Sequence, residues 1–172
     1  MMNGHHVEIA MPVNTAPARH YTMQVERLED TVEEMKLLHA AHWQETEGYR
    51  HGLTLDFDYD RVIKQHEQKG GFLLYTLRCN GEMVGNCGVY LSTSVHTKKL
   101  IATEDTLFVL EGHRGRHSID FINFVDDDLQ QRGITELTMT VKIVNNVWRY
   151  VKRRGAVPVA MQLVKVYPNV RT

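Results

Sequence analysis

The spacing of apolar and polar residues changes several times along the chain, and each change marks the boundary of an expected element. Residues 21–28 (YTMQVERL) alternate between apolar and polar side chains, which predicts a strand. Apolar positions then recur at helical spacing as far as about Trp43, and Asp30 or Thr31 is the expected N-cap of that helix. A polar segment separates it from a shorter helix, expected over 59–69.

Extended patterns replace helical ones in the middle of the chain. Residues 71–94 read as two strands joined by an Asn-Gly pair, the strongest short sequence signal for a β-hairpin. A two-residue turn fixes the register and sets Cys87 opposite Leu74, so Cys79 and Cys87 are not cross-strand neighbours. No disulfide is therefore expected between them. A third strand over 98–110 completes an antiparallel meander.

Helices and strands alternate in the last part of the chain. Residues 115–132 form an amphipathic pattern that ends at Gly133. The apolar stripe of this helix is expected to consist of Ile119, Ile122, Val125 and Leu129, widened by Phe121 and Phe124. A strand over 134–144, a short helix over 145–154 and a last strand over 157–166 follow. The predicted order is β, α, α, β, β, β, α, β, α, β.

Composition is typical of one compact soluble domain. The 172 residues are 42% apolar and 24% charged, so residues 21–172 are expected to fold as one unit after a loosely ordered arm at 1–20. The formal net charge of -1 disfavours a general nucleic-acid binder. Two cysteines, no signal-peptide pattern and no long apolar run favour a cytoplasmic protein outside membranes. The neighbours His5 and His6 have no further ligands in sequence, so no metal is expected.

The stretch VLEGHRGRHSIDF, residues 109–121, joins an apolar strand end to an amphipathic helix through a basic turn that contains glycine. Backbone N–H groups at a helix start have no intrahelical partner, and with the helix dipole they favour a phosphate. Arg114 and Arg116 add positive charge beside them. The stretch therefore predicts a local anion site.

This element order, with a basic turn after the third strand of a meander, resembles the GNAT superfamily of N-acetyltransferases over roughly residues 22–166. Residues 94–115 are also similar to members encoded in bacteriophage genomes, which would place the protein in the host cytoplasm. The resemblance implies a mixed α/β (α+β) domain: a mostly antiparallel central sheet of about six to seven strands, about four flanking helices, and a cofactor cleft between two splayed strands. It implies acetyl-CoA as co-substrate and an amine as acceptor.

The family's acetyl-CoA signature is a hydrophobic strand end followed by Gln/Arg-x-x-Gly-x-Gly/Ala, and Arg114 stands at its first position. The resemblance implies that backbone N–H groups of the turn hold the pyrophosphate, the turn being Arg114, Gly115, Arg116, His117, Ser118 and Ile119. It implies that strand backbone pairs with the pantetheine arm, at Leu107, Phe108 and Val109. His117 and Ile119 stand where the family prefers small residues, so the turn is expected to lie farther from the phosphates or to follow another path.

Residues 145–156 (NNVWRYVKRRGA) are similar to the family's Asn-containing helix beside the cofactor thiol. The resemblance implies that Asn145 and Asn146 contact the cofactor and that a tyrosine protonates the departing thiolate. Tyr150 is the candidate acid, but it lies five residues before Gly155 instead of the family's four, about 100° around the helix. It is therefore expected to be either a displaced acid or a packing residue.

Transfer to an amine needs a group that accepts the amine proton. Glu104 and Asp105 lie on the strand before the basic turn and point to opposite faces, so only one can face the acceptor. The resemblance implies a carboxylate base on this strand; we favour Glu104 over Asp105, and the other would cap or pair within the sheet. His96, in the preceding loop, is the alternative base, since histidine titrates near neutrality.

The polar and aromatic segment 42–58 is the expected entrance for the acceptor, with Trp43, Glu45 and Tyr49 as contacts. Acidic residues there favour a cationic acceptor, small molecule or protein: Glu45, Glu47, Asp56, Asp58 and Asp60. The resemblance implies direct attack of a primary amine on the thioester, without an acetyl-enzyme intermediate. Two alternatives stay open: a virion-associated or host-directed binding module without transfer activity, and modification of a base amine in nucleic acid through the arginines at 149–154. A homodimer also fits the sequence.

Overall fold

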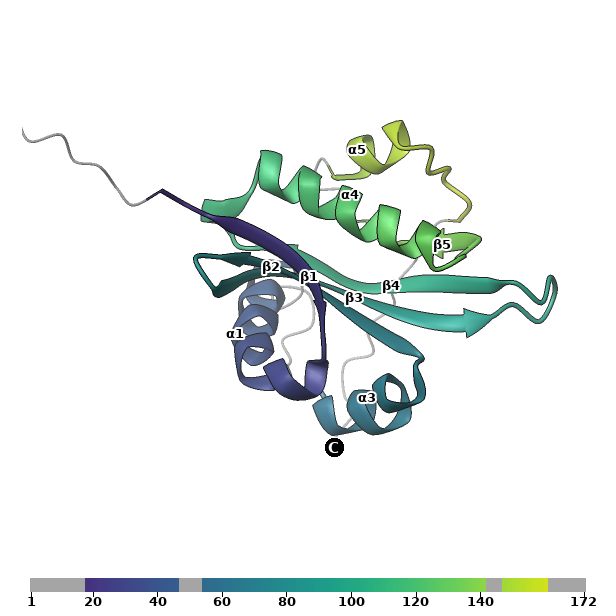
Figure 1. The fold of residues 1–172 in the computed structure, drawn as a ribbon, viewed down its shortest axis with the longest axis horizontal. Helices are drawn as coiled ribbons and strands as arrows, with labels where there is room; N and C mark the ends of the chain where they lie inside the picture. Colours follow the sequence, from purple (N-terminus) through teal and green to yellow (C-terminus); the bar gives the residue numbers. More distant parts are fainter. Residues whose placement is uncertain (1–17, 47–53, 142–146, 161–172) are drawn as a thin grey trace, which may run out of the picture.

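The computed structural model describes residues 18–46, 54–141 and 147–160, which form a sheet with helices on both faces (Figure 1). The strands are β1 (Tyr21–Glu26), β2 (Phe72–Cys79), β3 (Glu82–Thr93), β4 (Leu100–Val109) and β5 (Glu136–Thr138). The helices are α1 (Leu28–Thr46), α3 (Tyr59–Gln65), α4 (Arg116–Gln131) and α5 (Val147–Arg153), with short 3-10 turns η1 (Glu67–Lys69) and η2 (Glu111–His113). No helix in these ranges has the length and apolar character needed to cross a membrane.

The strands lie side by side in chain order, and the first four are antiparallel neighbours. Strand β5 joins β4 in parallel, so the chain must cross over between them, and α4 is that crossover. The pairing of β4 with β5 covers only Ile101 to Thr103, at the beginning of β4. Beyond Thr103, β4 has no pairing with β5 among the described residues. This part of β4 coincides with the cofactor cleft that the sequence predicts.

The Asn-Gly hairpin forms as predicted. Asn80 and Gly81 have φ angles of 52° and 88°, as a type I′ turn requires, and Cys79 pairs with Glu82. A register shift between Leu77 and Arg78 then offsets the strands, so Cys87 lies opposite Tyr75 and not Leu74. The shift was not visible in the sequence because residues 83–89 of β3 are buried on both faces, so an alternation of apolar and polar side chains does not mark the register there. The two thiols are free, as expected.

Two apolar clusters fill the two sides of the sheet. The cluster under α4 contains Phe121, Val125 and Leu129 of that helix, which follow one another by one turn. Ile119, predicted to lie in this stripe, is 41% exposed, so the buried face of α4 is rotated relative to the predicted one. The cluster under α1 and α3 contains, among others, Leu28, Met35, Leu38, Val62, Ile63 and Phe108.

Helix α1 begins earlier than predicted. Its first residue is Leu28, ahead of both expected N-caps Asp30 and Thr31. The Glu67 carboxylate accepts hydrogen bonds from the backbone N–H groups of Leu28 and Glu29. The cap therefore comes from η1, a distant part of the chain, which local sequence signals cannot indicate. The helix also continues past Trp43 to Thr46.

Polar side chains tie β1, β2 and α1 together on the α1 face. Arg78 on β2 makes two bonds to Glu26 of β1, at 2.7 and 2.8 Å, and two to Glu34 of α1, both at 2.8 Å. The guanidinium lowers the pKa of Glu26 to about 2 and also lowers that of Glu34. The three elements are thus joined by one charge network with few exposed atoms, since the side chains of Arg78 and Glu26 are 14% and 15% exposed.

A second polar contact lies deeper on the same face. His39 of α1 is 6% exposed, and its Nδ1 lies 2.9 Å from the hydroxyl of Tyr59 on α3. Burial, and then the nearby His42, lower the pKa of His39 to about 4, while burial raises that of Tyr59 to about 12. Both side chains are therefore neutral at physiological pH.

The end of the chain differs from the prediction of a last strand. Residues 156–160 have no strand pairing, and 161–166 lie outside the described residues. The sheet accordingly has five described strands, fewer than the predicted six to seven. The expected arm also lies mostly outside the description, because only 18–20 of its residues are placed.

Candidate active site

The basic turn after β4 is open where a phosphate is expected. Gly115 precedes α4 with φ 95° and ψ −130°, a conformation that glycine adopts and other residues avoid. Among the described residues, no side-chain cap hydrogen bond is made at Gly115, and apart from its chain neighbours and the helix's own backbone no atom lies within 4 Å of where a Cβ of Gly115 would be. The glycine therefore leaves the start of the helix accessible to an anion.

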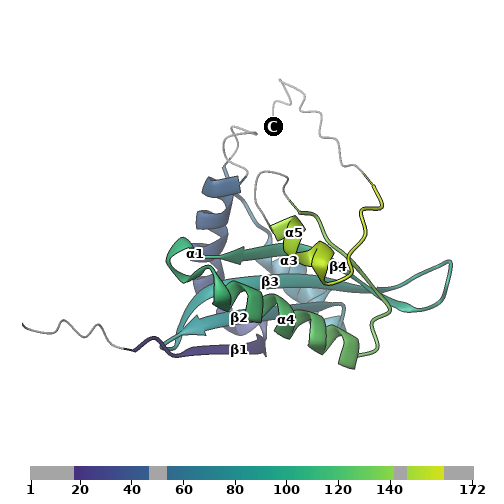
Figure 2. The same ribbon diagram turned by 90° about the horizontal axis from the view of Figure 1, so that it is seen from above.

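His117 fits the turn although it replaces a small residue. Its ring stacks on Tyr21 of β1, with centroids 3.7 Å apart and an interplanar angle of 17°. The hydroxyl of Tyr21 lies 3.0 Å from Nδ1 of His113 in the same turn. Figures 1 and 2 place the beginnings of β1 and α4 at the same end of the sheet. The imidazole is thus held against β1, so its bulk is turned toward protein.

Arg114 and Arg116 take different positions. Arg114 bends back, donating from Nε to the carbonyl of Val109 (2.8 Å) and from Nη2 to Glu45 of α1 (2.6 Å). Its guanidinium also lies 5.5 Å from the ring centroid of Phe108. Arg116 has a side chain 89% exposed, with Asp120 at 3.7 Å. Arg114 therefore joins the strand end to α1, and Arg116 is the more accessible cation.

The edge of β4 alternates in the way that pantetheine pairing would need. The N–H of Leu110 donates to the carbonyl of Val84 on β3, at 2.9 Å. Because successive residues of an antiparallel strand direct their backbone groups to opposite edges, Phe108 also faces β3, and Leu107 and Val109 face the β5 side. The side chain of Phe108 is 6% exposed on the α1 face, and its backbone groups face β3 instead of the expected cofactor edge.

A bulge separates the two candidate bases. Val89 pairs with Glu104 and Gly88 with Thr106, so Asp105 is the extra residue of β4. Glu104 is 9% exposed on the face that carries α4, and Oε2 accepts the N–H of Thr140 at 3.2 Å. Asp105 is exposed, yet partial desolvation by surrounding atoms raises its pKa. The bulge was not predicted, and because it interrupts the alternation of β4 the predicted opposite orientation of the two carboxylates stays a prediction.

Tyr150 contacts α4. Its hydroxyl donates to Oδ1 of Asn123 at 2.6 Å, and Arg154 pairs with Asp126 at 2.8 Å. These two contacts hold α5 beside α4, so the tyrosine has a structural partner at its reactive oxygen. Asn145 and Asn146 lie outside the described residues.

The expected acceptor residues are only partly brought together. Trp43 lines a groove of about 560 Å³ between α1 and residues 54–59, together with Asp56, Phe57 and Tyr59. Tyr49 and Glu47 lie outside the described residues. His96 lies in the turn between β3 and β4, at the far end of β4 from the basic turn (Figure 1), so the structure does not bring it to the site.

The acidic residues of this region mostly have structural partners. Glu45 pairs with Arg114, the carboxylate of Asp58 accepts the N–H of Arg61 as a helix cap, and Asp60 pairs with Lys64 at 2.6 Å. Asp56 alone among the described four lines the groove. The charge argument for a cationic acceptor is therefore weaker than the sequence suggested.

No model of a known protein family matches the chain, and no curated protein matches it in sequence. Solved structures do match it. An aminoglycoside acetyltransferase from an uncultured soil metagenomic sample aligns at 14% identity over 88% of this chain and 97% of that one, with a TM-score of 0.64. A ribosomal-protein-alanine N-acetyltransferase from Brucella melitensis aligns at 18% identity over 87% and 100%, with a TM-score of 0.61.

A glucosamine-6-phosphate N-acetyltransferase from Arabidopsis thaliana gives a similar match, at 14% identity over 86% of this chain and 99% of that chain, with a TM-score of 0.62. Identities this low show a shared fold. The fold is therefore the mixed α+β, mostly antiparallel fold of GNAT-type N-acetyltransferases, as the sequence predicted, with five described strands and four described helices.

Proposed function

We propose that the protein is an acyl-CoA-dependent N-acetyltransferase that transfers an acetyl group from acetyl-CoA to a primary amine by direct attack. The observation that carries the proposal is the continuity of two features. The edge of β4 with the backbone groups of Leu107 and Val109 leads directly into the glycine turn, whose helix N–H groups have no side-chain cap. A strand edge and an anion site in this order suit a pantetheine arm and its pyrophosphate.

The chain's own residues would bind and orient the donor. N–H groups from Gly115 to Ile119 would hold the pyrophosphate, with Arg116 as its accessible cation. Backbone groups of Leu107 and Val109 would align the pantetheine amides. Acetyl-CoA supplies a thioester, whose carbonyl carbon is the electrophile. Most of the rate would come from positioning this carbon against the amine.

We favour Asp105 as the base, which reverses the preference from the sequence. The amine nitrogen forms a bond to the carbonyl carbon, the carbon–sulfur bond breaks, and one amine proton passes to the Asp105 carboxylate directly or through water. Asp105 is the exposed extra residue of the β4 bulge, and desolvation raises its pKa. Glu104 is buried on the α4 face and accepts the N–H of Thr140.

The test is release of free thiol from acetyl-CoA with a panel of primary amines, including aminoglycosides, amino sugars and peptides. Asp105→Asn is expected to lower kcat about 100-fold, and Glu104→Gln less than about 5-fold. Equal or larger loss in Glu104→Gln would return the base to Glu104. If the protein fails to bind acetyl-CoA at high micromolar concentration in calorimetry, it is a binding module with this fold and not a transferase.

The acceptor class is a primary amine on a small molecule or a protein. The three matched structures are an aminoglycoside acetyltransferase, a ribosomal-protein-alanine N-acetyltransferase and a glucosamine-6-phosphate N-acetyltransferase, so the fold is compatible with each of these acceptors. We also propose that the protein acts in the cytoplasm and that it is similar to phage-encoded members of the superfamily. Modification of nucleic acid is the lesser candidate, since Arg154, in the arginine cluster that would carry it, pairs with Asp126.

A further inference from the structure

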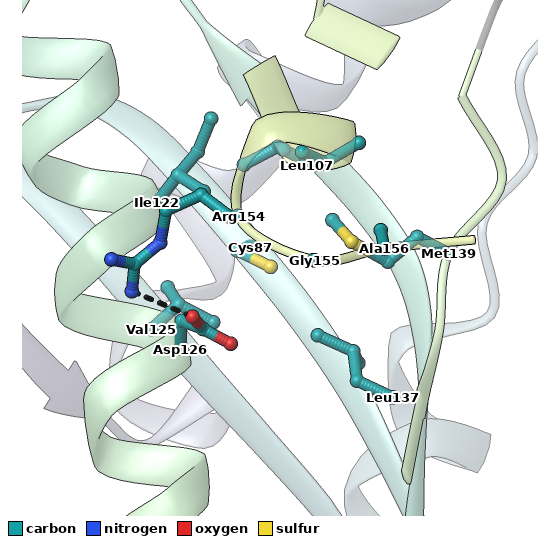
Figure 3. A pocket seen from close by; sticks show the side chains of 11 residues that line it. Cys87, Leu107, Ile122, Val125, Asp126, Leu137, Met139, Arg154, Gly155 and Ala156 are labelled. Carbon is teal, nitrogen blue, oxygen red and sulfur yellow. Dashed lines mark hydrogen bonds and ion pairs between the residues drawn. The ribbon is translucent and has the colours of Figure 1, made fainter. Parts of the chain in front are cut away.

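An apolar cavity of about 230 Å³ lies between the sheet, α4 and α5 (Figure 3). Its floor is formed by side chains of β3, β4 and the β5 region, and its walls by α4, α5 and the residues after α5. The lining residues that matter below are Cys87, Leu107, Ile122, Met139 and Ala156. The Arg154–Asp126 ion pair lies at one side and is the charged part of the lining.

The cavity adjoins the strand edge proposed for the donor. Leu107 lines the cavity with its side chain, and its backbone groups face the β5 side of β4. The cavity lies on the α4 face of the sheet, and Asp105 is the exposed extra residue of the bulge in the same strand, two residues before Leu107. A thioester placed at the bulge therefore has an apolar cavity and a candidate proton acceptor close by.

The size of the cavity exceeds what an acetyl group needs. A water molecule occupies about 30 Å³ of liquid, so the space corresponds to about seven or eight such volumes. An acetyl group has three heavy atoms and would leave most of the space empty. Apolar walls are not hydrated well, so filling them with methylene groups is favourable.

We infer that this cavity is the acyl pocket and that the preferred donor is a CoA thioester of a linear, saturated acyl chain of about four to six carbons. The inference rests on the proposed function and names the donor class for the same site. The chemical steps are the same as for an acetyl group. The amine nitrogen forms a bond to the acyl carbon, and the bond between that carbon and sulfur breaks. The amine proton passes to Asp105, and the CoA thiolate takes a proton from solvent.

Cys87 would contact the chain without reacting with it. Burial, with Glu104 and Asp105 nearby, raises the pKa of its thiol, so the sulfur stays protonated and acts as a small apolar group. Covalent transfer through this cysteine is therefore not part of the inference.

The experiment compares acetyl-, butyryl-, hexanoyl- and decanoyl-CoA as donors with one accepted amine. Each added methylene group should raise kcat/KM by about fourfold up to hexanoyl-CoA. The kcat/KM for decanoyl-CoA should be lower than that for hexanoyl-CoA, because the longer chain exceeds the cavity. Ile122→Phe fills the cavity from α4. Ala156→Leu narrows it from the segment after α5, at a residue that is exposed. Each should lower kcat/KM for hexanoyl-CoA at least 10-fold and change the acetyl-CoA value less than 3-fold.

Leu37→Phe adds the same ring to the exposed face of α1 and should keep the wild-type chain-length profile. Thermal melts check that each variant folds. If Ile122→Phe does not fold, Ala156→Leu still tests the inference. If acetyl-CoA is the best donor, the inference is wrong and the proposed function stands. If both filling variants lose affinity for free CoA, the cavity holds pantetheine and the inference is also wrong. If no CoA thioester binds, the proposed function fails first.

Discussion

The two faces of the sheet are built from the same four long strands and yet differ in what holds them. On the α1 face, Arg78 joins two strands to a helix, and His39 with Tyr59 joins two helices beneath the surface. On the α4 face the floor is largely apolar, with Glu104 buried in it, and the hydroxyl of Tyr75 on β2 ties the sheet to Asp128 of α4. Both faces thus carry an apolar cluster, and they differ in the polar contacts that join the helices to the strands.

The largest difference between the faces should appear when Arg78 is removed. Arg78→Ala leaves the carboxylates of Glu26 and Glu34 close together without their cation, and we expect the free energy of unfolding to fall by about 3 kcal/mol. Lys64→Ala is the control, because its pair with Asp60 is exposed and screened by solvent, so its removal should leave the free energy of unfolding nearly unchanged. Urea denaturation measures both, and equal effects would mean that the network has no special role.

His39 should make stability depend on pH below neutrality. Its pKa is about 4 in the folded protein against 6.5 for the ordinary side chain, so the unfolded chain takes up a proton first. Stability is full above pH 6.5 and falls as pH drops toward 4, by up to about 3 kcal/mol. Urea denaturation at several pH values tests this window. His39→Phe should remove the pH dependence, and its persistence in that variant would assign it to another group.

Glu26 should produce a separate loss at lower pH. Its folded pKa of about 2 lies below the ordinary 4.5, so its contribution is complete above pH 4.5 and disappears as pH falls toward 2. Solvent screening reduces the effect to about 2 kcal/mol or less. Glu26→Gln should flatten this part of the stability profile while leaving the His39 window in place. A single loss of stability with falling pH in the wild type, not separable into two steps, would contradict the assignment to two independent groups.

The smallest effect is expected on the α4 face. Tyr150→Phe removes one hydrogen bond to Asn123, which should lower the free energy of unfolding by about 1 kcal/mol. Because its hydroxyl already has this partner, kcat should change less than about threefold. Asn123→Ala is the matched variant and should give a similar loss of stability. A 100-fold fall in kcat for Tyr150→Phe alone would instead make it the acid for the thiolate.

The sequence predicted the elements that depend on local chemistry. The hairpin follows from Asn80 and Gly81, and the turn before α4 from its glycine, because backbone preferences act over a few residues. What it missed depends on contacts between distant residues. Glu67 caps α1, and Glu45 forms an ion pair with Arg114. Neither contact can be recognised from the neighbouring sequence.

Bulges are the other part that sequence reasoning missed. The one at Asp105 inserts an extra residue into β4, so alternation no longer predicts which way each of the two carboxylates points. The candidate turn was therefore predictable, whereas the choice of base was not. The position of His117 also needed the structure, since only the stack on Tyr21 explains how an imidazole fits where glycine is usual.

The support of the basic turn by β1 has a consequence for how the protein forms. Tyr21 and His113 lie 92 residues apart in the chain, so this contact closes a very long loop. A nascent chain leaving the ribosome has β1 long before the turn, and the edge strand must wait for β2 before it can pair. The turn before α4 would thus be among the last parts to mature, after the rest of the sheet is protected from hydrogen exchange.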